Sequence, residues 1–236
     1  MPPFNIEIQS HDGKTFGAYL AKANKANAPV LLVIQEIFGV NESMRAMCDN
    51  WAREGYHAIC PDIFWRQQPG VELTDKTPAE WQQAIAYMNG MDLELCLKDL
   101  QSTLKQARAM PGTNGRIGTM GFCLGGKLAY LMAARSDANC NISYYGVGLT
   151  ELLNEVPNIK NPLLMHFAEN DKYLNGDALQ NVRDAVAKNP RIESYVYAGV
   201  EHAFSRINGE HFDADAAKKA FERSTKFLDV NLSTPL

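Results

Sequence analysis

The sequence lacks the features that mark membrane-spanning and secreted proteins. No apolar run approaches the ~20 residues that a helix needs to cross a bilayer. The first eight residues, MPPFNIEI, contain neither a basic segment nor an apolar core, so we expect no secretory signal peptide. These absences predict a cytoplasmic protein that does not act at a membrane.

Cysteine is scarce, and its spacing is typical of neither a disulfide framework nor a zinc site. The chain has five cysteines, an odd number: Cys48, Cys60, Cys96, Cys123 and Cys140. Unpaired cysteines of this kind are usual in a reducing compartment. We expect no metal and no other cofactor.

A dense block of basic residues is also missing. The formal net charge is −4 and 21% of the 236 residues are charged, so we expect neither nucleic acid nor an anionic membrane as a partner. No repeat, low-complexity stretch or long linker divides the chain. Its length therefore predicts a single domain over residues 1–236.

Strand-like apolar runs alternate with helical patterns almost throughout, which predicts an α/β fold with a mostly parallel central sheet and helices on both faces. The predicted strands are Asn5–Gln9, Phe16–Ala21, Pro29–Gln35, Tyr56–Cys60, Arg116–Met120, Asn141–Tyr145, Pro162–Ala168 and Ile192–Tyr197, the first two forming an antiparallel edge hairpin. The predicted helices are Asn41–Glu54, Pro78–Met88, Met91–Met110, Leu124–Ala134, Asp177–Ala187 and Asp213–Val230, with Asn41 as a cap and Asn89-Gly90 as a separator.

The stretch Gly121-Phe122-Cys123-Leu124-Gly125 lies between a predicted strand and a predicted helix. A nucleophile between two glycines at such a corner forms the nucleophile elbow of the α/β-hydrolase fold. The turn is tight, so its flanking positions must be small. The helix that follows directs free N–H groups and its positive dipole end toward the nucleophile. Cys123 is therefore the predicted nucleophile, unless it is simply a buried cysteine at a helix start.

A cysteine nucleophile needs a base, and the base needs an orienting acid. In this fold the acid and then the histidine follow later strands. Asp171 follows the strand Pro162–Ala168, and His202 follows the strand Ile192–Tyr197. Both positions belong to the carboxyl end of the predicted sheet, where Cys123 also lies, so we assign these two residues as acid and base.

Other residues compete for both roles. His166 lies inside an apolar strand and is interpreted as a hydrogen-bonded core residue. Glu169 ends a strand, and Asp177 is interpreted as a helix cap. We therefore prefer Asp171 as the acid and His202 as the base.

Two backbone N–H groups are expected to bind the oxyanion. One belongs to Leu124, directly after the predicted nucleophile, and the other to Ile37, in the loop after the strand Pro29–Gln35. Glu36 precedes Ile37 at the same sheet end. Its position allows either a catalytic carboxylate or an ordinary solvated or arginine-paired glutamate.

Taken together, these pieces resemble the dienelactone hydrolase (carboxymethylenebutenolidase) family, and the match runs from about Asn5 to the C-terminal helix. The matching segments are Gln35-Glu-Ile-Phe-Gly-Val-Asn41, Cys60-Pro-Asp62, Gly121-Phe-Cys-Leu-Gly-Gly126, Tyr144-Tyr-Gly-Val-Gly148, Asp171 and His202-Ala-Phe-Ser-Arg206. The resemblance implies that Cys123 rests as a thiol turned toward Glu36. Substrate displaces Glu36, which takes the thiol proton, and the thiolate then attacks a lactone to form a thioester. A thiol that stays protonated until substrate arrives is protected from oxidation.

The resemblance also implies a substrate with a free carboxylate, because Arg206 matches a carboxylate-binding arginine of the family. A second family arginine near position 81 is missing, since this chain has Trp81 and no arginine between Gln67 and Lys105. The pocket then uses one arginine, recruits Arg66 or Lys76, or accepts a different ester.

The predicted activity is hydrolysis of a small lactone or activated ester by a monomer or weak homodimer. Alternatives are a broader carboxylesterase or thioesterase, and a non-catalytic relative that senses redox state or binds a ligand. The candidate apolar pocket walls, any of which could instead be core, are Phe38, Phe64, Tyr144 and Tyr173.

Overall fold

The computed structural model describes residues 4–233, and the chain packs into two compact units. Unit 1 contains residues 4–118 of the described chain, and unit 2 contains residues 119–233. The chain passes from one unit to the other within strand β5, Thr113–Phe122. The prediction of a single domain over residues 1–236 stays a prediction.

Eight strands are hydrogen-bonded in the order β1-β2-β4-β3-β5-β6-β7-β8. The remaining strands are β1 (Ile6–Gln9), β2 (Thr15–Ala21), β3 (Ala28–Ile34), β4 (His57–Pro61), β6 (Cys140–Tyr144), β7 (Leu163–Ala168) and β8 (Ile192–Tyr197). The helices are α1 (Glu42–Arg53), α2 (Pro78–Gly90), α3 (Leu93–Arg108), α4 (Leu124–Arg135), α5 (Gly176–Val186) and α6 (Ala214–Leu232), with a 3₁₀ helix η1 at Leu149–Asn158.

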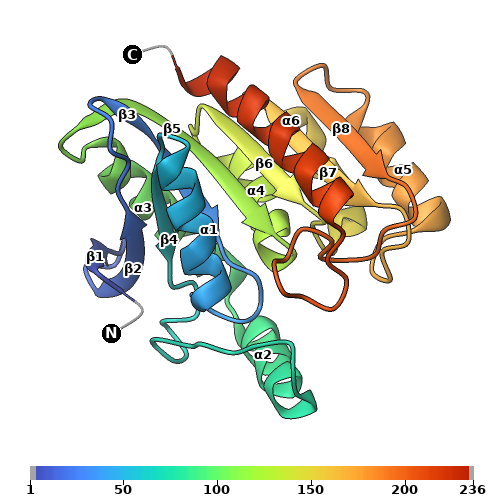
Figure 1. Cartoon of the computed structure of the whole chain (residues 1–236), viewed down its shortest axis with the longest axis horizontal. Coiled ribbons are helices and arrows are strands. Elements are labelled where there is room, and N and C mark those ends of the chain that lie inside the picture. Colours follow the sequence, from blue (N-terminus) through green and yellow to red (C-terminus); the bar gives the residue numbers. More distant parts are fainter. Residues whose placement is uncertain (1–3, 234–236) are drawn as a thin grey trace. The chain divides into compact units, whose positions relative to one another are not determined.

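Unit 1 begins with the expected hairpin, in which β1 pairs antiparallel with β2. Strand β2 pairs antiparallel with β4, whereas β3 and β4 are parallel. All seven residues of β3 are buried, as a strand covered on both faces requires. Helices α1 and α3 both pack on β3 and β4, and Figure 1 shows α1 in front of these strands and α3 behind them.

Unit 2 is built on the parallel pairs β6–β7 and β7–β8. Helix α6 packs on β6 and β7, and α4 packs on β6. Figure 1 shows α6 on the near side of these strands and α4 on the far side. The carboxyl ends of β6, β7 and β8 therefore meet at one edge, and the loops that follow β7 and β8 carry Asp171 and His202.

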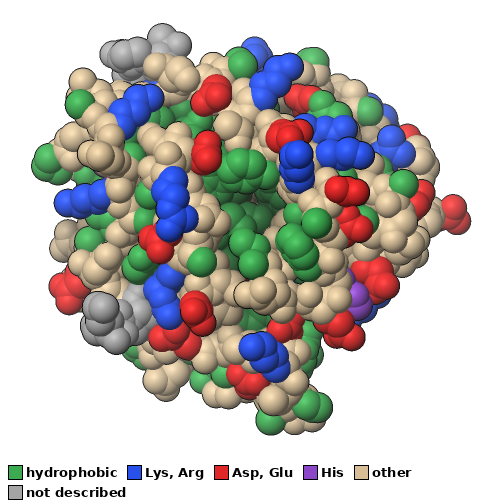
Figure 2. All heavy atoms as spheres, viewed as in Figure 1, with side chains coloured by type: hydrophobic (Ala, Val, Ile, Leu, Met, Phe, Trp, Pro, Cys, Tyr) green, Lys and Arg blue, Asp and Glu red, His purple; other side chains and the backbone are tan. Residues whose placement is uncertain are grey.

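The predicted fold class, an α/β fold with a mostly parallel sheet flanked by helices on both faces, is therefore confirmed. Figure 2 shows acidic and basic side chains interspersed over one face of the molecule, in keeping with the modest net charge of −4. No helix in residues 4–233 is both long enough and apolar enough to cross a membrane.

Helix boundaries follow their caps where a cap can be recognised. Asn41 caps α1 as predicted, and its side chain accepts the N–H of Met44. Asn89-Gly90 does not separate two helices, because both residues belong to the last turn of α2 and Asp92 caps α3. Helix η1 was not predicted, since a 3₁₀ helix lacks the 3.6-residue period that marks an α-helix.

Candidate active site

Cys123 occupies the corner between β5 and α4 in a strained backbone conformation. Its φ and ψ angles are 55° and −112°, values that L-residues rarely adopt. A Cβ atom at Gly121 would lie 1.9 Å from the carbonyl oxygen of Gly125, and one at Gly126 would lie 2.4 Å from that of Tyr144. These glycines therefore allow the close backbone approach that a tight strand-to-helix turn demands.

The corner is anchored to the end of β6. The Cys123 N–H donates to the Tyr144 carbonyl at 3.1 Å, and the Ser143 hydroxyl donates to the Gly126 carbonyl at 2.9 Å. Within α4 the Lys127 N–H donates to the Cys123 carbonyl at 3.1 Å. The N–H of Leu124, at the first position of α4, has no partner within the helix and is a suitable donor to an oxyanion.

His202 and Asp171 form a buried hydrogen-bonded pair after neighbouring strands. The His202 Nδ1 atom lies 2.7 Å from Asp171 Oδ2, and the two residues are 5% and 3% exposed. The Nε2 atom of His202 is buried and has no hydrogen-bond partner among the described residues. The carboxylate fixes the proton on Nδ1, which leaves Nε2 with a lone pair that can accept a proton.

The loops that carry this pair are joined by backbone hydrogen bonds. The Asn170 N–H donates to the Val200 carbonyl at 2.9 Å, which links the loop of the acid to the loop of the base. The second oxygen of Asp171, Oδ1, accepts the Tyr173 N–H at 2.9 Å. Both carboxylate oxygens are thus occupied, which holds Asp171 in a single orientation toward His202.

Glu169 and Asp177, the two acids that compete with Asp171, are both exposed, whereas Asp171 is buried. Glu169 is exposed and accepts the Gly199 N–H at 2.8 Å. Asp177 is exposed in the first turn of α5, whose N-cap is Asn175, so the interpretation of Asp177 as the cap is wrong. The position before Gly176 already has the extended backbone of a cap, which places Asp177 inside the helix.

His166 is a core histidine, as its place in an apolar strand indicated. It is fully buried, with Nδ1 2.9 Å from the Tyr197 hydroxyl and Nε2 3.0 Å from the Ser224 hydroxyl. Burial, together with the nearby Arg223 guanidinium, lowers the pKa of His166 to about 3. Because both ring nitrogens have partners, this histidine has no free site for proton transfer.

Two tyrosine rings flank His202 edge to face. Tyr145 lies 5.1 Å from it, centroid to centroid, and is buried, whereas Tyr173 lies 4.7 Å away and is 49% exposed. Tyr144 turns to the core instead, where its hydroxyl lies 2.7 Å from Ser224 and its ring contacts His166. The sequence analysis did not single out Tyr145. The available signal was an aromatic residue followed by glycine at the end of a buried strand.

Two of the other cysteines have thiols whose pKa is raised. All five are buried thiols. Burial and the adjacent Cys60 thiol raise the pKa of Cys48 well above its ordinary value, and burial raises that of Cys96. Within residues 4–233 no three or more His, Cys, Asp or Glu side chains gather in the manner of a metal site.

Unit 1 carries the candidate residues that follow β3. Glu36, Ile37 and Phe38 are 6%, 4% and 2% exposed. The Phe38 ring meets Trp81 of α2 edge to face, 5.1 Å between centroids, and the Trp81 indole N–H donates to the Asp75 carbonyl at 3.0 Å. Trp81 therefore presents an apolar surface beside the loop of Glu36 and Ile37.

The side chains of Phe64 and Arg66, also in unit 1, both contact neighbouring side chains. Phe64 is fully buried and stacks on Tyr87 at 5.6 Å. Arg66 donates from Nε to Asp99 Oδ2 and from Nη1 to Asp12 Oδ2, each at 2.8 Å. Two carboxylates thus neutralise this guanidinium, which argues against its recruitment to bind a substrate anion.

Arg206 lies in unit 2, four residues after His202. Its side chain is partly exposed, and the Arg206 N–H donates to the Ala203 carbonyl at 2.9 Å. A Cβ at Gly209 would lie 3.0 Å from Arg206 Cδ, so the small residue at 209 makes room for the arginine stem. Arg206 therefore provides a cationic side chain close in sequence to His202, the candidate base.

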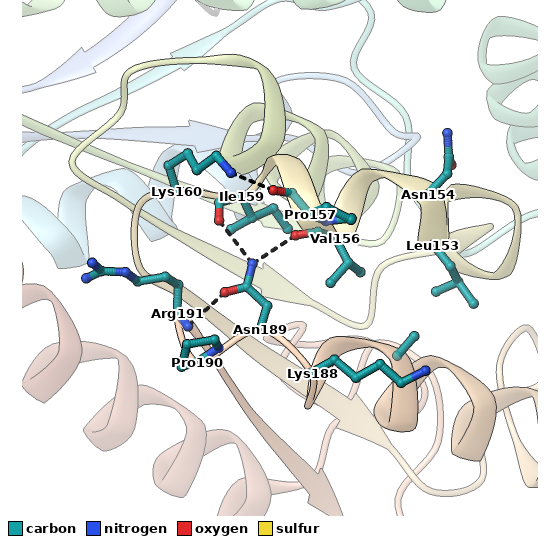
Figure 3. A pocket seen from close by; sticks show the side chains of 11 residues that line it. Leu153, Asn154, Val156, Pro157, Ile159, Lys160, Lys188, Asn189, Pro190 and Arg191 are labelled. Carbon is teal, nitrogen blue, oxygen red and sulfur yellow. Dashed lines mark hydrogen bonds between the residues drawn. The ribbon is translucent and has the colours of Figure 1, made fainter.

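A groove of about 920 Å³ lies elsewhere in unit 2, between η1 and the segment that leads into β8. Figure 3 shows Lys160 turned toward the Pro157 carbonyl, and the side chains of Lys188 and Arg191 extending in opposite directions. The groove borders the amino end of β8, whereas His202 follows the carboxyl end. It is therefore separate from the candidate active site.

Comparisons with known proteins agree with this fold. The sequence profile of the dienelactone hydrolase family matches residues 16–232. A protein of Azospirillum brasilense named "Putative carboxymethylenebutenolidase" is 46% identical, over 97% of this chain and 99% of its own. A carboxymethylenebutenolidase of Pseudomonas putida is 39% identical, over 94% of each chain.

Solved structures point the same way. The crystal structure of a "Putative Dienelactone Hydrolase" from Klebsiella pneumoniae superposes with a TM-score of 0.82 at 27% identity, covering 97% of this chain and 96% of that one. The fold and the family match together define a hydrolase of the α/β-hydrolase class. Within that class, the chain belongs to the dienelactone hydrolase family.

Proposed function

We propose that this hydrolase cleaves a small carboxylate-bearing lactone or activated ester through a thioester on Cys123. The observation that carries the proposal is the buried His202–Asp171 pair, whose Nε2 atom is buried with no hydrogen-bond partner among residues 4–233. Burying an unsatisfied polar atom costs about 1–3 kcal/mol, so a general base that receives a proton in each turnover explains its presence.

In the proposed reaction the Cys123 sulfur attacks the lactone carbonyl carbon after Glu36 takes its proton. The carbonyl oxygen becomes an anion, to which Leu124 and Ile37 donate their backbone N–H groups. The ring C–O bond then breaks, and the resulting enolate, which stays joined to the acyl group, takes the proton from the Glu36 carboxyl. Water attacks the thioester while His202 removes its proton. The C–S bond then breaks, which releases the acid, and His202 returns the proton to the Cys123 thiolate.

The strand-to-helix corner supports Cys123 as the nucleophile. The positive end of α4 stabilises the thiolate, whereas burial raises the pKa of the Cys48 and Cys96 thiols. A redox sensor needs no oriented base, so the bond between His202 and Asp171 argues against the non-catalytic alternative. The roles of Glu36 and Ile37 rest on the family resemblance and on their position directly after β3.

Arg206 supplies the cation for the substrate carboxylate in this proposal, since a guanidinium offers paired N–H donors to a carboxylate. One observation favours a second candidate, a broader carboxylesterase. Trp81 and Phe38 form an aromatic contact where the family resemblance leads us to expect a second arginine. An apolar surface there suits the neutral part of a substrate and would tolerate uncharged esters.

Steady-state hydrolysis of a dienelactone and of a neutral aryl acetate by the intact chain tests the proposal. We expect faster turnover of the dienelactone, and loss of at least 99% of the activity in Cys123→Ala. The matched control is Cys96→Ala, which removes a buried thiol of α3 and should retain activity. Activity that survives Cys123→Ala would refute the nucleophile, and preference for the acetate would favour the broader esterase.

A further inference from the structure

We infer that Tyr145 is a positioning residue that fixes the ring of His202 relative to the corner that carries Cys123. The inference rests on the proposed function, because it treats His202 as the general base. Tyr145 itself need touch no substrate. Its contacts join the end of β6, which anchors Cys123, to the loop that carries the base.

The backbone of Tyr145 is strained in a way that the surrounding structure maintains. Its φ angle is +37°, a value that is a true outlier for a bulky residue. Such conformations are energetically unfavourable and cluster at functional sites. The Tyr145 N–H donates to the His166 carbonyl at 2.8 Å, which holds this residue at the end of β6 despite the strain.

The positive φ of Tyr145 accompanies a change in the direction of its ring relative to that of Tyr144. Tyr144 and Tyr145 are adjacent, yet Tyr144 sends its ring to His166 and Ser224, whereas Tyr145 sends its ring to His202. The Tyr144 carbonyl accepts the Cys123 N–H at 3.1 Å. A single peptide unit therefore lies between the residue that anchors the nucleophile and the residue that contacts the base.

The side chain of Tyr145 contacts three of the four residues from His202 to Ser205. Its ring is 2% exposed and meets His202 at 5.1 Å and 66°, and Phe204 at 5.4 Å and 72°. Its hydroxyl lies 2.9 Å from the Ser205 hydroxyl. Because both the ring and its hydroxyl tip contact the same loop, Tyr145 resists movement of that loop as well as rotation of the His202 ring.

The hydrogen bond to Asp171 does not fix the His202 ring by itself. One bond at Nδ1 leaves the ring able to tilt about that bond, which changes the direction of Nε2. Edge-to-face aromatic contacts favour defined ring angles. Tyr173 is half exposed on one side of His202, so the buried Tyr145 provides the more rigid contact. A base displaced by about 1 Å can lose on the order of 10² in rate.

Substitutions at Tyr145 distinguish the contribution of its ring from that of its hydroxyl. Tyr145→Asn tolerates a positive φ but removes the ring, and Tyr145→Phe keeps the ring but loses the bond to Ser205. We expect Tyr145→Asn to lower kcat by about 10- to 100-fold with kcat/KM changed by less than about threefold, and Tyr145→Phe to lower kcat by less than about fivefold. Should Tyr145→Asn fail to fold, Tyr145→Leu keeps the apolar volume without an aromatic edge and carries the same expectation.

Proton NMR supplies a readout that a general loss of stability would not give. The Nδ1 proton shared by His202 and Asp171 should appear far downfield, and His202→Gln identifies it by its loss. We expect the signal to broaden in Tyr145→Asn, while the ring protons of the core residue His166 stay in place as an internal control for folding. Unchanged kcat together with an unchanged His202 signal in folded Tyr145→Asn would overturn the inference.

The outcome is distinguishable from failure of the proposed function. If Cys123→Ala stays active, Cys123 is not the nucleophile. A broadened His202 signal in Tyr145→Asn would even then support the positioning of the ring. If Cys123→Ala is inactive and Tyr145→Asn leaves both kcat and the signal intact, the proposed function stands and the role of Tyr145 is refuted.

Discussion

Unit 2 contains two buried histidines whose surroundings differ in one decisive respect. His166 has both ring nitrogens within hydrogen-bond distance of neutral hydroxyls, those of Tyr197 and Ser224. His202 has one nitrogen on the Asp171 carboxylate and the other without a partner among the described residues. Burial alone therefore does not distinguish a core histidine from a base. The nitrogen left without a partner and the charge of the partner that is present make the distinction.

Substituting each of the two histidines in turn gives the largest expected effect on activity. We expect His202→Ala to lower kcat by at least ~10²-fold, because water attack on the thioester loses its base. His166→Gln should keep kcat within about threefold, since its side chain has no role in proton transfer, but should lower the free energy of unfolding. Steady-state kinetics and urea unfolding of both variants measure this opposite pattern. Equal loss of activity in the two variants would contradict the distinction.

The pH dependence of stability gives a smaller effect that sharpens the comparison. The pKa of His166 falls to about 3 in the folded chain, whereas in the unfolded chain it is ~6.5. Between these values the unfolded state binds a proton that the folded state does not, so the free energy of unfolding falls as pH drops from about 6.5 toward 3. The full contribution, present above about pH 6.5, is of order 5 kcal/mol.

Urea unfolding of wild type and His166→Gln at several pH values isolates this contribution. Other groups also titrate in acid, so the quantity to compare is the difference between the two proteins. We expect the stability advantage of the wild type to shrink as the pH falls through the window, because glutamine does not titrate. A difference that stays constant with pH would show that His166 is protonated alike in the folded and unfolded chains.

Some of these features follow from sequence because they depend on local pattern and chain order. His166 lies in an unbroken apolar run, which already marked it as core. Asp171 and His202 follow successive strands, and parallel strands bring their carboxyl ends to one edge, so their hydrogen bond was foreseeable. The corner at Cys123 was visible because only small residues allow the close approach found at Gly121 and Gly126.

Other features depend on backbone angles that residue types do not reveal. The positive φ of Tyr145 directs its ring to His202, and nothing in the order Tyr144-Tyr145 indicates which ring faces the base. The capping of α5 by Asn175 rather than Asp177 was missed because Gly176, an unusual first helical residue, obscures the helix start. The roles of all the candidate site residues stay predictions, those of Cys123, His202, Asp171 and Leu124 as well as those of Glu36, Ile37 and Arg206.

Locating the acyl group during turnover tests the central claim most directly. Mixing the wild-type protein or His202→Ala with a slowly hydrolysed aryl ester, quenching in acid and mapping peptides by mass spectrometry would show which side chain is acylated. We predict an acyl group on Cys123 that hydroxylamine removes, with greater accumulation in His202→Ala because hydrolysis of the thioester loses its base. An acyl group on another residue, or none on Cys123 while product forms, would contradict the account.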